Sequence, residues 1–172
     1  MTRAARARVA VAALGAFAAC SAGEADPSTG TYTVQFPSTA AAVATDFVQV
    51  LAFEVKSPDE RAGLCQELIT ARLTTPGSLT PSVPAAPAAN ICEMRAGRKP
   101  VTVPYGEHAL LAIAQRKDRQ DQLRDFMIGC AIMTLGDGDA PLPIPVRLVS
   151  VNAPVPTTTC GSVGEYCDGR CQ

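Results

Sequence analysis

Seven cysteines constrain the fold of this 172-residue chain more than any other feature. Six lie at positions 65 to 171, and we expect all six to form disulfides: Cys65, Cys92, Cys130, Cys160, Cys167 and Cys171. Disulfides take cysteines two at a time, so an odd count leaves one over, and we expect it to be Cys20. Three of the six lie in the body of the chain and three in its tail. If all six pair within the chain, at least one disulfide must therefore join the tail to the body.

The pairing itself stays open at this level, since six cysteines allow fifteen connectivities. If Cys65 and Cys92 close the Pro-rich stretch between them, Cys130 is the expected partner of the tail. A zinc site in the tail is disfavoured, because it needs four ligands and reduced thiols. We therefore expect a tail whose shape depends on disulfides.

Residues 1–19 have the features of a secretory leader. Three arginines in the first eight residues are followed by the small, apolar stretch 9–19, which is typical of the charged and apolar regions of a signal peptide. That stretch is too short to cross a bilayer, since a transmembrane helix needs about twenty residues. We expect residues 1–19 to be removed on export.

Phe17-Ala18-Ala19-Cys20 resembles the lipobox of bacterial lipoproteins, although that family usually has Leu where this chain has Phe17. The resemblance implies that Cys20 is the lipid attachment site and that the chain is held to a membrane. Ser21 implies the outer membrane of a Gram-negative bacterium. The alternative is ordinary cleavage after Ala18, which would leave Cys20 as a plain thiol.

The mature chain is long enough for one hydrophobic core. Net charge is −1 for the whole chain, and it falls to −4 once the three leader arginines are removed. No clustered basic surface for phosphate is evident, so we do not expect a nucleic-acid partner. No residue pattern predicts a cofactor.

Short alternating or apolar segments predict strands through much of the chain. The expected strands occupy 31–36, 46–55, 101–103, 108–115, 126–135 and 146–151. One short helix, from Pro58 to about Leu73, is predicted by the capping signature Ser57-Pro58-Asp59-Glu60. Residues 74–90, with four prolines, predict an extended surface loop.

This pattern predicts a mainly β fold, an antiparallel β-sandwich of transthyretin-like or immunoglobulin-like type. The expected organisation is a leader (1–19), a lipid-anchored tether (20–30), a sandwich domain (31–152) and a Cys-rich tail (153–172). One core is expected to contain Phe47, Leu51, Phe53, Phe126, Ile128 and Ile132. Residues 101–112 resemble the strand, Pro-x-Gly turn and strand of transthyretin-like and carboxypeptidase-regulatory-like modules. That resemblance implies a structural, stalk or binding role.

His108 is the single histidine, so any mechanism that needs imidazole must use it. No second histidine completes an H-E-x-x-H zinc motif, and no G-x-S-x-G segment marks a nucleophile. We expect no catalytic residue and no metal site, with His108 as a hydrogen-bonded strand residue. The acids of 137–139 are too few for calcium, and the charged segment 116–125 is expected to be a solvated hairpin tip.

Together these features predict an exported, lipid-anchored protein with a non-catalytic binding or structural role at the cell envelope. Its expected contacts are a membrane, through the lipid, and an unknown protein or envelope partner. One alternative is a secreted hydrolase that uses His108. Another is a small inhibitor or immunity-type lipoprotein that blocks a partner through the Pro-rich or charged loop.

Overall fold

The structure is a computed structural model that describes residues 28–137, 140–150 and 154–171. The leader and Cys20 lie outside the described residues. The strands are β1 (Tyr32–Gln35), β2 (Phe47–Glu54), β3 (Gly106–Lys117), β4 (Leu123–Leu135), β5 (Leu142–Pro145) and β6 (Arg147–Leu148). The helices are α1 (Thr39–Val43), α2 (Pro58–Thr74), α3 (Ile91–Arg95) and α4 (Val163–Cys167), with a 3₁₀ turn, η1 (Pro76–Ser78).

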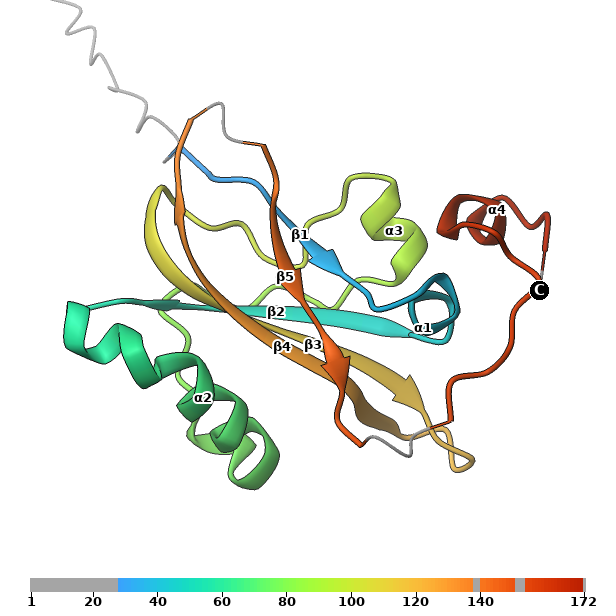
Figure 1. Ribbon diagram of the computed structural model, residues 1–172, viewed down its shortest axis with the longest axis horizontal. Helices are drawn as coiled ribbons and strands as arrows, with labels where there is room; N and C mark the ends of the chain where they lie inside the picture. The colour runs from blue at the N-terminus through green and yellow to red at the C-terminus, as the bar shows by residue number, and fades with distance from the viewer. Residues whose placement is uncertain (1–27, 138–139, 151–153, 172) are drawn as a thin grey trace, which may run out of the picture.

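An antiparallel sheet of four strands, in the order β2-β3-β4-β6, forms the centre of the fold. The second sheet is a parallel pair, β1 and β5 (Figure 1). Helix α2 packs on one face of the large sheet, where Leu64 and Leu68 contact Leu111 and its neighbours. The small sheet covers the other face, where Val34 and Ile144 are buried. Strands β3 and β4 are therefore covered on both faces, as their continuous apolar sequence predicts.

Helix α2 confirms the capping signature. Ser57 Oγ accepts a hydrogen bond from the Glu60 N–H at 3.2 Å, and the Glu60 carboxylate accepts one from the Lys56 N–H at 3.0 Å. The helix then runs for 17 residues, one residue beyond the predicted end. Its far end is held to β4 by two hydrogen bonds from Arg72 to Asp125, of 2.7 and 2.8 Å. Burial raises the pKa of Asp125, but the hydrogen bonds from Arg72 and Gln115, together with the Arg72 charge, lower it overall.

The expectation of a mainly β chain with one short helix is wrong. The described residues contain three more helices, α1, α3 and α4, each of five residues. Five residues make little more than one helical turn, so no hydrophobic periodicity can reveal such a helix. Each instead starts at a side-chain cap, from Ser38, Asn90 and Ser162 respectively. The antiparallel sheet and the disulfides are confirmed, within a mixed α and β fold.

Two expected strands are also corrected. Val101 and Val103 are buried, but their segment forms only an isolated bridge, between Thr29 and Pro104. The last expected strand shrinks to the two residues of β6. Val101 and Val103 alternate because they are buried against the core, whereas Val149 of the last segment is exposed.

The expected single core is divided between the two faces of the sheet. Leu51, Phe53 and Ile128 are buried on the α2 face, and Ile132 is packed against them. Phe126 lies in the other cluster, while the half-buried Phe47 belongs to neither.

A β-bulge explains the position of Phe126. Gln115 pairs with Asp125 and Ala114 pairs with Met127, which leaves Phe126 as an extra residue without a partner on β3. A bulge interrupts the alternation of side chains along a strand. Phe126 and Met127 therefore both join the cluster beneath the small sheet.

Strand β5 and its continuation pass very close to the large sheet at Gly129. A Cβ atom at this position would collide with the backbone carbonyl of Pro145. Glycine is therefore required here for close approach of two backbones. Within the described residues, no helix has the length and apolar character needed to span a membrane.

Candidate binding groove

A cavity of about 590 Å³ lies between β1, helix α3 and the tail helix α4. We call it the groove. Most of its surface is apolar, and three of its lining residues have basic side chains. The lining is Tyr32, Thr33, Val34, Phe36, Ile91, Met94, Arg95, Gly97, Arg98, Lys99, Pro100, Ser162, Val163 and Gly164.

Strand β1 presents its unpaired edge to this groove. On its other edge the carbonyls of Thr31 and Gln35 accept hydrogen bonds from β5 and its flanking residues, at 3.3 and 3.0 Å. Backbone groups alternate in direction along a strand, so those of Tyr32 and Val34 point away from β5. No partner for these groups occurs among the described residues.

The segment that precedes β3 explains why this edge is open. Residues 103–105 pair with the same edge farther back, where the Gly30 N–H donates to the Val103 carbonyl at 3.0 Å. The pairing stops at Tyr32, whose hydroxyl donates to the Val101 carbonyl at 2.7 Å and accepts from the Val101 N–H at 3.0 Å. The tyrosine ring thus takes the place of further backbone pairing. Burial raises the pKa of Tyr32 to about 12, so the hydroxyl keeps its proton.

Helix α3 forms the opposite wall, and its start is locally encoded. Asn90 Oδ1 accepts from the backbone N–H groups of Cys92 and Glu93, at 3.0 and 2.8 Å. The Glu93 carboxylate accepts from the Asn90 N–H at 2.9 Å, which completes a capping box. The Asn-x-x-Glu spacing is visible in the sequence, so this helix start could have been found there.

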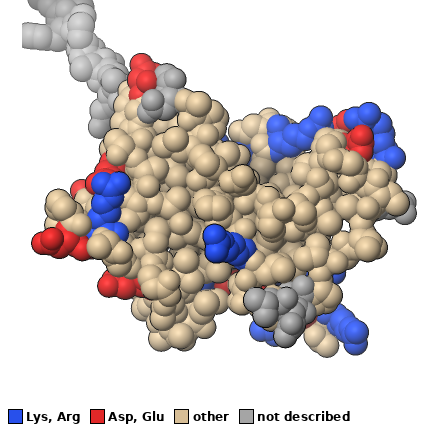
Figure 2. Space-filling view, in the orientation of Figure 1, with Lys and Arg blue, Asp and Glu red and all other residues tan. Residues whose placement is uncertain are grey.

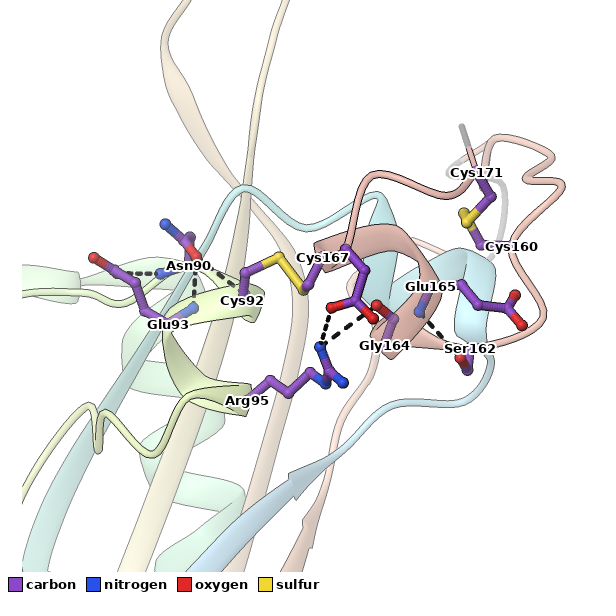
Figure 3. The surroundings of a disulfide bond; sticks show 11 residues. Asn90, Cys92, Glu93, Arg95, Cys160, Ser162, Gly164, Glu165, Cys167 and Cys171 are labelled. Carbon is purple, nitrogen blue, oxygen red and sulfur yellow. Dashed lines mark hydrogen bonds and ion pairs between the residues drawn. A yellow bond between two sulfur atoms is a disulfide. The ribbon is translucent and has the colours of Figure 1, made fainter.

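The tail provides the third wall (Figure 3). A disulfide joins Cys92 of α3 to Cys167 of α4, and a second, Cys160–Cys171, closes the tail on itself. Arg95 adds an ion pair to Asp168 at 2.8 Å. The local fold of α4 depends on Ser162 Oγ, which accepts from the Glu165 N–H at 3.2 Å.

One disulfide therefore joins tail and body, as the odd number of cysteines on each side requires. The expected role of Cys130 is wrong, since it pairs with Cys65 of α2. Cys130 lies on the α2 face of β4, next to Ile128 and Ile132 in the same cluster. The tail packs against α3 and α1 instead, so Cys92 is the cysteine within its reach.

The groove carries positive charge. Arg95, Arg98 and Lys99 line it, and no acidic residue does within the part of the chain that the structure describes. Figure 2 shows Lys and Arg side chains gathered over α3 and α4. Arg95 and Arg98 have carboxylate partners outside the lining, whereas Lys99 is exposed and has no ion-pair partner among the described residues.

His108 lies away from the groove, and its expected hydrogen bond is absent. The residue is 7% exposed, and neither ring nitrogen has a hydrogen-bond partner among the described residues. It lines a separate cavity of about 410 Å³ together with Glu54, its cross-strand neighbour on β2, and Ser82. The Ser82 hydroxyl donates to the Ala52 carbonyl at 3.1 Å and forms no hydrogen bond with His108.

The two loops considered for partner binding form hydrogen bonds within the fold, and apart from Ala89 their residues are exposed or half-buried. Strands β3 and β4 extend into the charged segment, and at the tip Asp118 accepts hydrogen bonds from the backbone of Gln120 and Gln122. These bonds and that from Arg124 hold the pKa of Asp118 below its usual value. The Pro-rich segment lies along β2, where Ala89 forms a bridge with Val48.

Within the described residues, no group of three His, Cys, Asp or Glu side chains is arranged to hold a metal ion. Of the turn 137–139, only Asp137 is described, and its carboxylate accepts from the Tyr105 hydroxyl at 3.1 Å. No known protein family, curated protein or solved structure matches this chain.

Proposed function

We propose that this chain is an exported, lipid-anchored protein of the cell envelope whose folded part binds a partner in the groove without catalysing a reaction. The groove is the observation that carries the proposal. Its volume of about 590 Å³ lies within the range of roughly 300 to 1,000 Å³ that is common for binding sites. An apolar lining with a few polar or charged groups is also typical of such sites.

Three disulfides among the described residues support export, because disulfides persist in oxidising compartments such as the periplasm or the cell surface. Lipid on Cys20, with the outer membrane of a Gram-negative bacterium as destination, completes the proposal. Mass spectrometry of the mature amino terminus should find an acylated Cys20, and Cys20→Ala should release the protein from membranes. An unmodified terminus would refute the anchor.

The relation to two-sheet β-sandwiches also remains a proposal. The pair β1 and β5 packs on the same cluster as the large sheet, as a second sheet would. In this interpretation the remainder of the second layer is replaced by residues 89–104 and the tail. An experimental structure in which β1 and β5 pair elsewhere would contradict it.

The hydrolase alternative rests on His108, which lines a cavity and whose ring nitrogens have no hydrogen-bond partner among the described residues. Replacing His108 by Ala separates the two functions. If the protein binds without catalysis, the variant should keep its cellular phenotype at equal abundance. Loss of the phenotype with an intact fold would favour the hydrolase.

Site-specific photo-crosslinking in intact cells tests the groove. A photoreactive amino acid at Thr33, which is exposed and lines the groove, should give a discrete adduct with the partner. The matched control is Thr134, which is exposed on β4 and does not line the groove. The same adduct from both positions, or none from Thr33, would contradict the proposal.

A further inference from the structure

We propose that the ligand of the groove is an extended, acidic peptide segment of a partner protein, which adds to the free edge of β1 as a further strand. This inference rests on the proposed function and gives its ligand a chemical class. It follows from the backbone of β1, from the way the chain already uses this edge, and from the charges of the lining.

The backbone groups on the groove side of β1 need hydrogen-bond partners. The N–H and C=O groups of Tyr32 and Val34 point away from β5, and both residues line the groove. Donors and acceptors on one edge of a strand recur at every second residue, and an extended peptide supplies complementary groups at the same interval. An acyl chain would fill the apolar part of the groove but leave these groups unpaired, which has a free-energy cost.

The chain itself shows that this edge accepts a strand. The Tyr105 N–H donates to the Ser28 carbonyl, and the Gly30 N–H donates to the Val103 carbonyl, both at 3.0 Å. The bridge between Thr29 and Pro104 is antiparallel. A bound peptide would continue this pairing at Tyr32 and Val34, where the chain's own segment turns away. The Tyr32 hydroxyl, held by Val101, keeps that segment out of the groove.

The charges select an acidic peptide. Three cations line the groove, and Lys99 has no ion-pair partner among the described residues. A carboxylate on the peptide would pair with Lys99 without displacing an existing partner, and such charge complementarity favours the correct ligand over others. A basic peptide would meet the like charge of Lys99, and no acidic residue among the described lining residues would compensate it.

The first experiment measures which amides the ligand protects. Random heptapeptides displayed on phage are selected against the full chain with its disulfides formed, and a selected peptide is synthesised. Hydrogen exchange by NMR should then slow at the Tyr32 and Val34 amides by at least about tenfold on binding. The amides of Thr33 and Gln35, which face β5, should not change. Binding without this alternation would overturn strand addition.

The second experiment modifies the peptide. Methylating every second amide nitrogen should abolish binding in one register, because those amides would face β1. Methylating the alternate set should leave affinity within about twofold, because those amides face away. Equal effects of the two sets would refute the proposal.

The third experiment tests the charge. Lys99→Glu should weaken an acidic peptide by about tenfold, while Arg119→Glu at the β3–β4 hairpin tip, with the same change of charge, should have little effect. Both side chains are exposed, so neither change should disturb folding. Equal effects of the two variants would show that only overall charge matters, against a peptide carboxylate at Lys99.

Failure of this inference can be distinguished from failure of the proposed function. If Thr33 crosslinks to a partner but no peptide protects β1, the groove binds and the peptide class is wrong. If a fatty acid occupies the groove with no protection of β1 amides, the ligand is a lipid and strand addition is again wrong. If Thr33 gives no adduct, the proposed function itself fails.

Discussion

Removing the disulfide between the tail and α3, by Cys92→Ser together with Cys167→Ser, should detach the tail and leave the sheet folded. The bridge spans 75 residues, so a chain-entropy argument assigns it about 4.5 kcal/mol if the native state stays intact. The 11-residue bridge Cys160–Cys171 receives about 2.8 kcal/mol by the same relation.

The free energy of global unfolding should fall by less than this chain-entropy value, because few other contacts hold the tail to the body. No residue of α4 is buried. The ion pair of Arg95 with Asp168 has side chains 49% and 39% exposed, and such exposed pairs contribute only about 0 to 1 kcal/mol. Ordering each residue of a detached tail costs about 1 to 2 kcal/mol of backbone entropy. Opening of the tail alone therefore requires less free energy than unfolding.

Limited digestion with a non-specific protease, followed by non-reducing mass analysis, measures this. Cleavage within 154–159 should leave the wild-type tail linked to the body, and should free it from the double variant at a faster rate. The control Cys160→Ser with Cys171→Ser should keep its tail attached. Wild-type protease resistance in the double variant, or a global loss near 4.5 kcal/mol in denaturant, would refute the reasoning.

Three further predictions concern the core. Gly129→Ala should lower the free energy of unfolding by about 3 kcal/mol, because the new Cβ would collide with the carbonyl of Pro145. A urea midpoint equal to that of the wild type would contradict this close approach. Burial raises the pKa of Tyr32 to about 12, so the folded state disfavours its phenolate. The free energy of unfolding should therefore be highest below pH 10 and fall by about 2 to 3 kcal/mol as the pH rises to 12. Denaturant titrations between pH 9 and 11.5 should show a weaker decline for Tyr32→Phe, and parallel curves would show that another group is responsible. Asp125→Asn should cost about 2 kcal/mol near pH 7 by breaking the partly buried pair with Arg72. Since the pKa of Asp125 is lowered in the fold, this difference should shrink as the pH falls below about 4, and a constant difference would exclude the ion pair as its cause.

Local signals were sufficient for much of the sheet and for the long helix. The alternation of 31–36 and the apolar run of 46–55 predicted β1 and β2 within about two residues, because side chains of a strand alternate between faces whatever the strand pairs with. The capping signature at Ser57 predicted the start of α2 because a helix cap involves only residues that are neighbours in the sequence. Parity alone required a bridge between tail and body.

The choice of partners was decided by the tertiary structure. Whether Cys92 or Cys130 reaches the tail depends on which face of β4 Cys130 occupies. The bulge at Phe126, on the same strand, shifts the alternation of side chains between the two faces. The parallel pairing of β1 with β5 joins segments more than a hundred residues apart, and no periodicity specifies it. The three five-residue helices were likewise too short for a hydrophobic periodicity to show, although the Asn90 capping box marks the start of α3 in the sequence.

The groove belongs wholly to this second category. Its open edge exists because the Tyr32 hydroxyl meets the backbone of Val101, 69 residues away, and its third wall exists because Cys92 meets Cys167, 75 residues away. By itself, the sequence determined which segments can be strands, where α2 begins and that tail and body must be linked, because those properties follow from neighbouring residues and from counting. Only the packed fold determined which edge of β1 stays free and which cations lie beside it. Segments distant in the sequence become neighbours only when they pack on the same hydrophobic core.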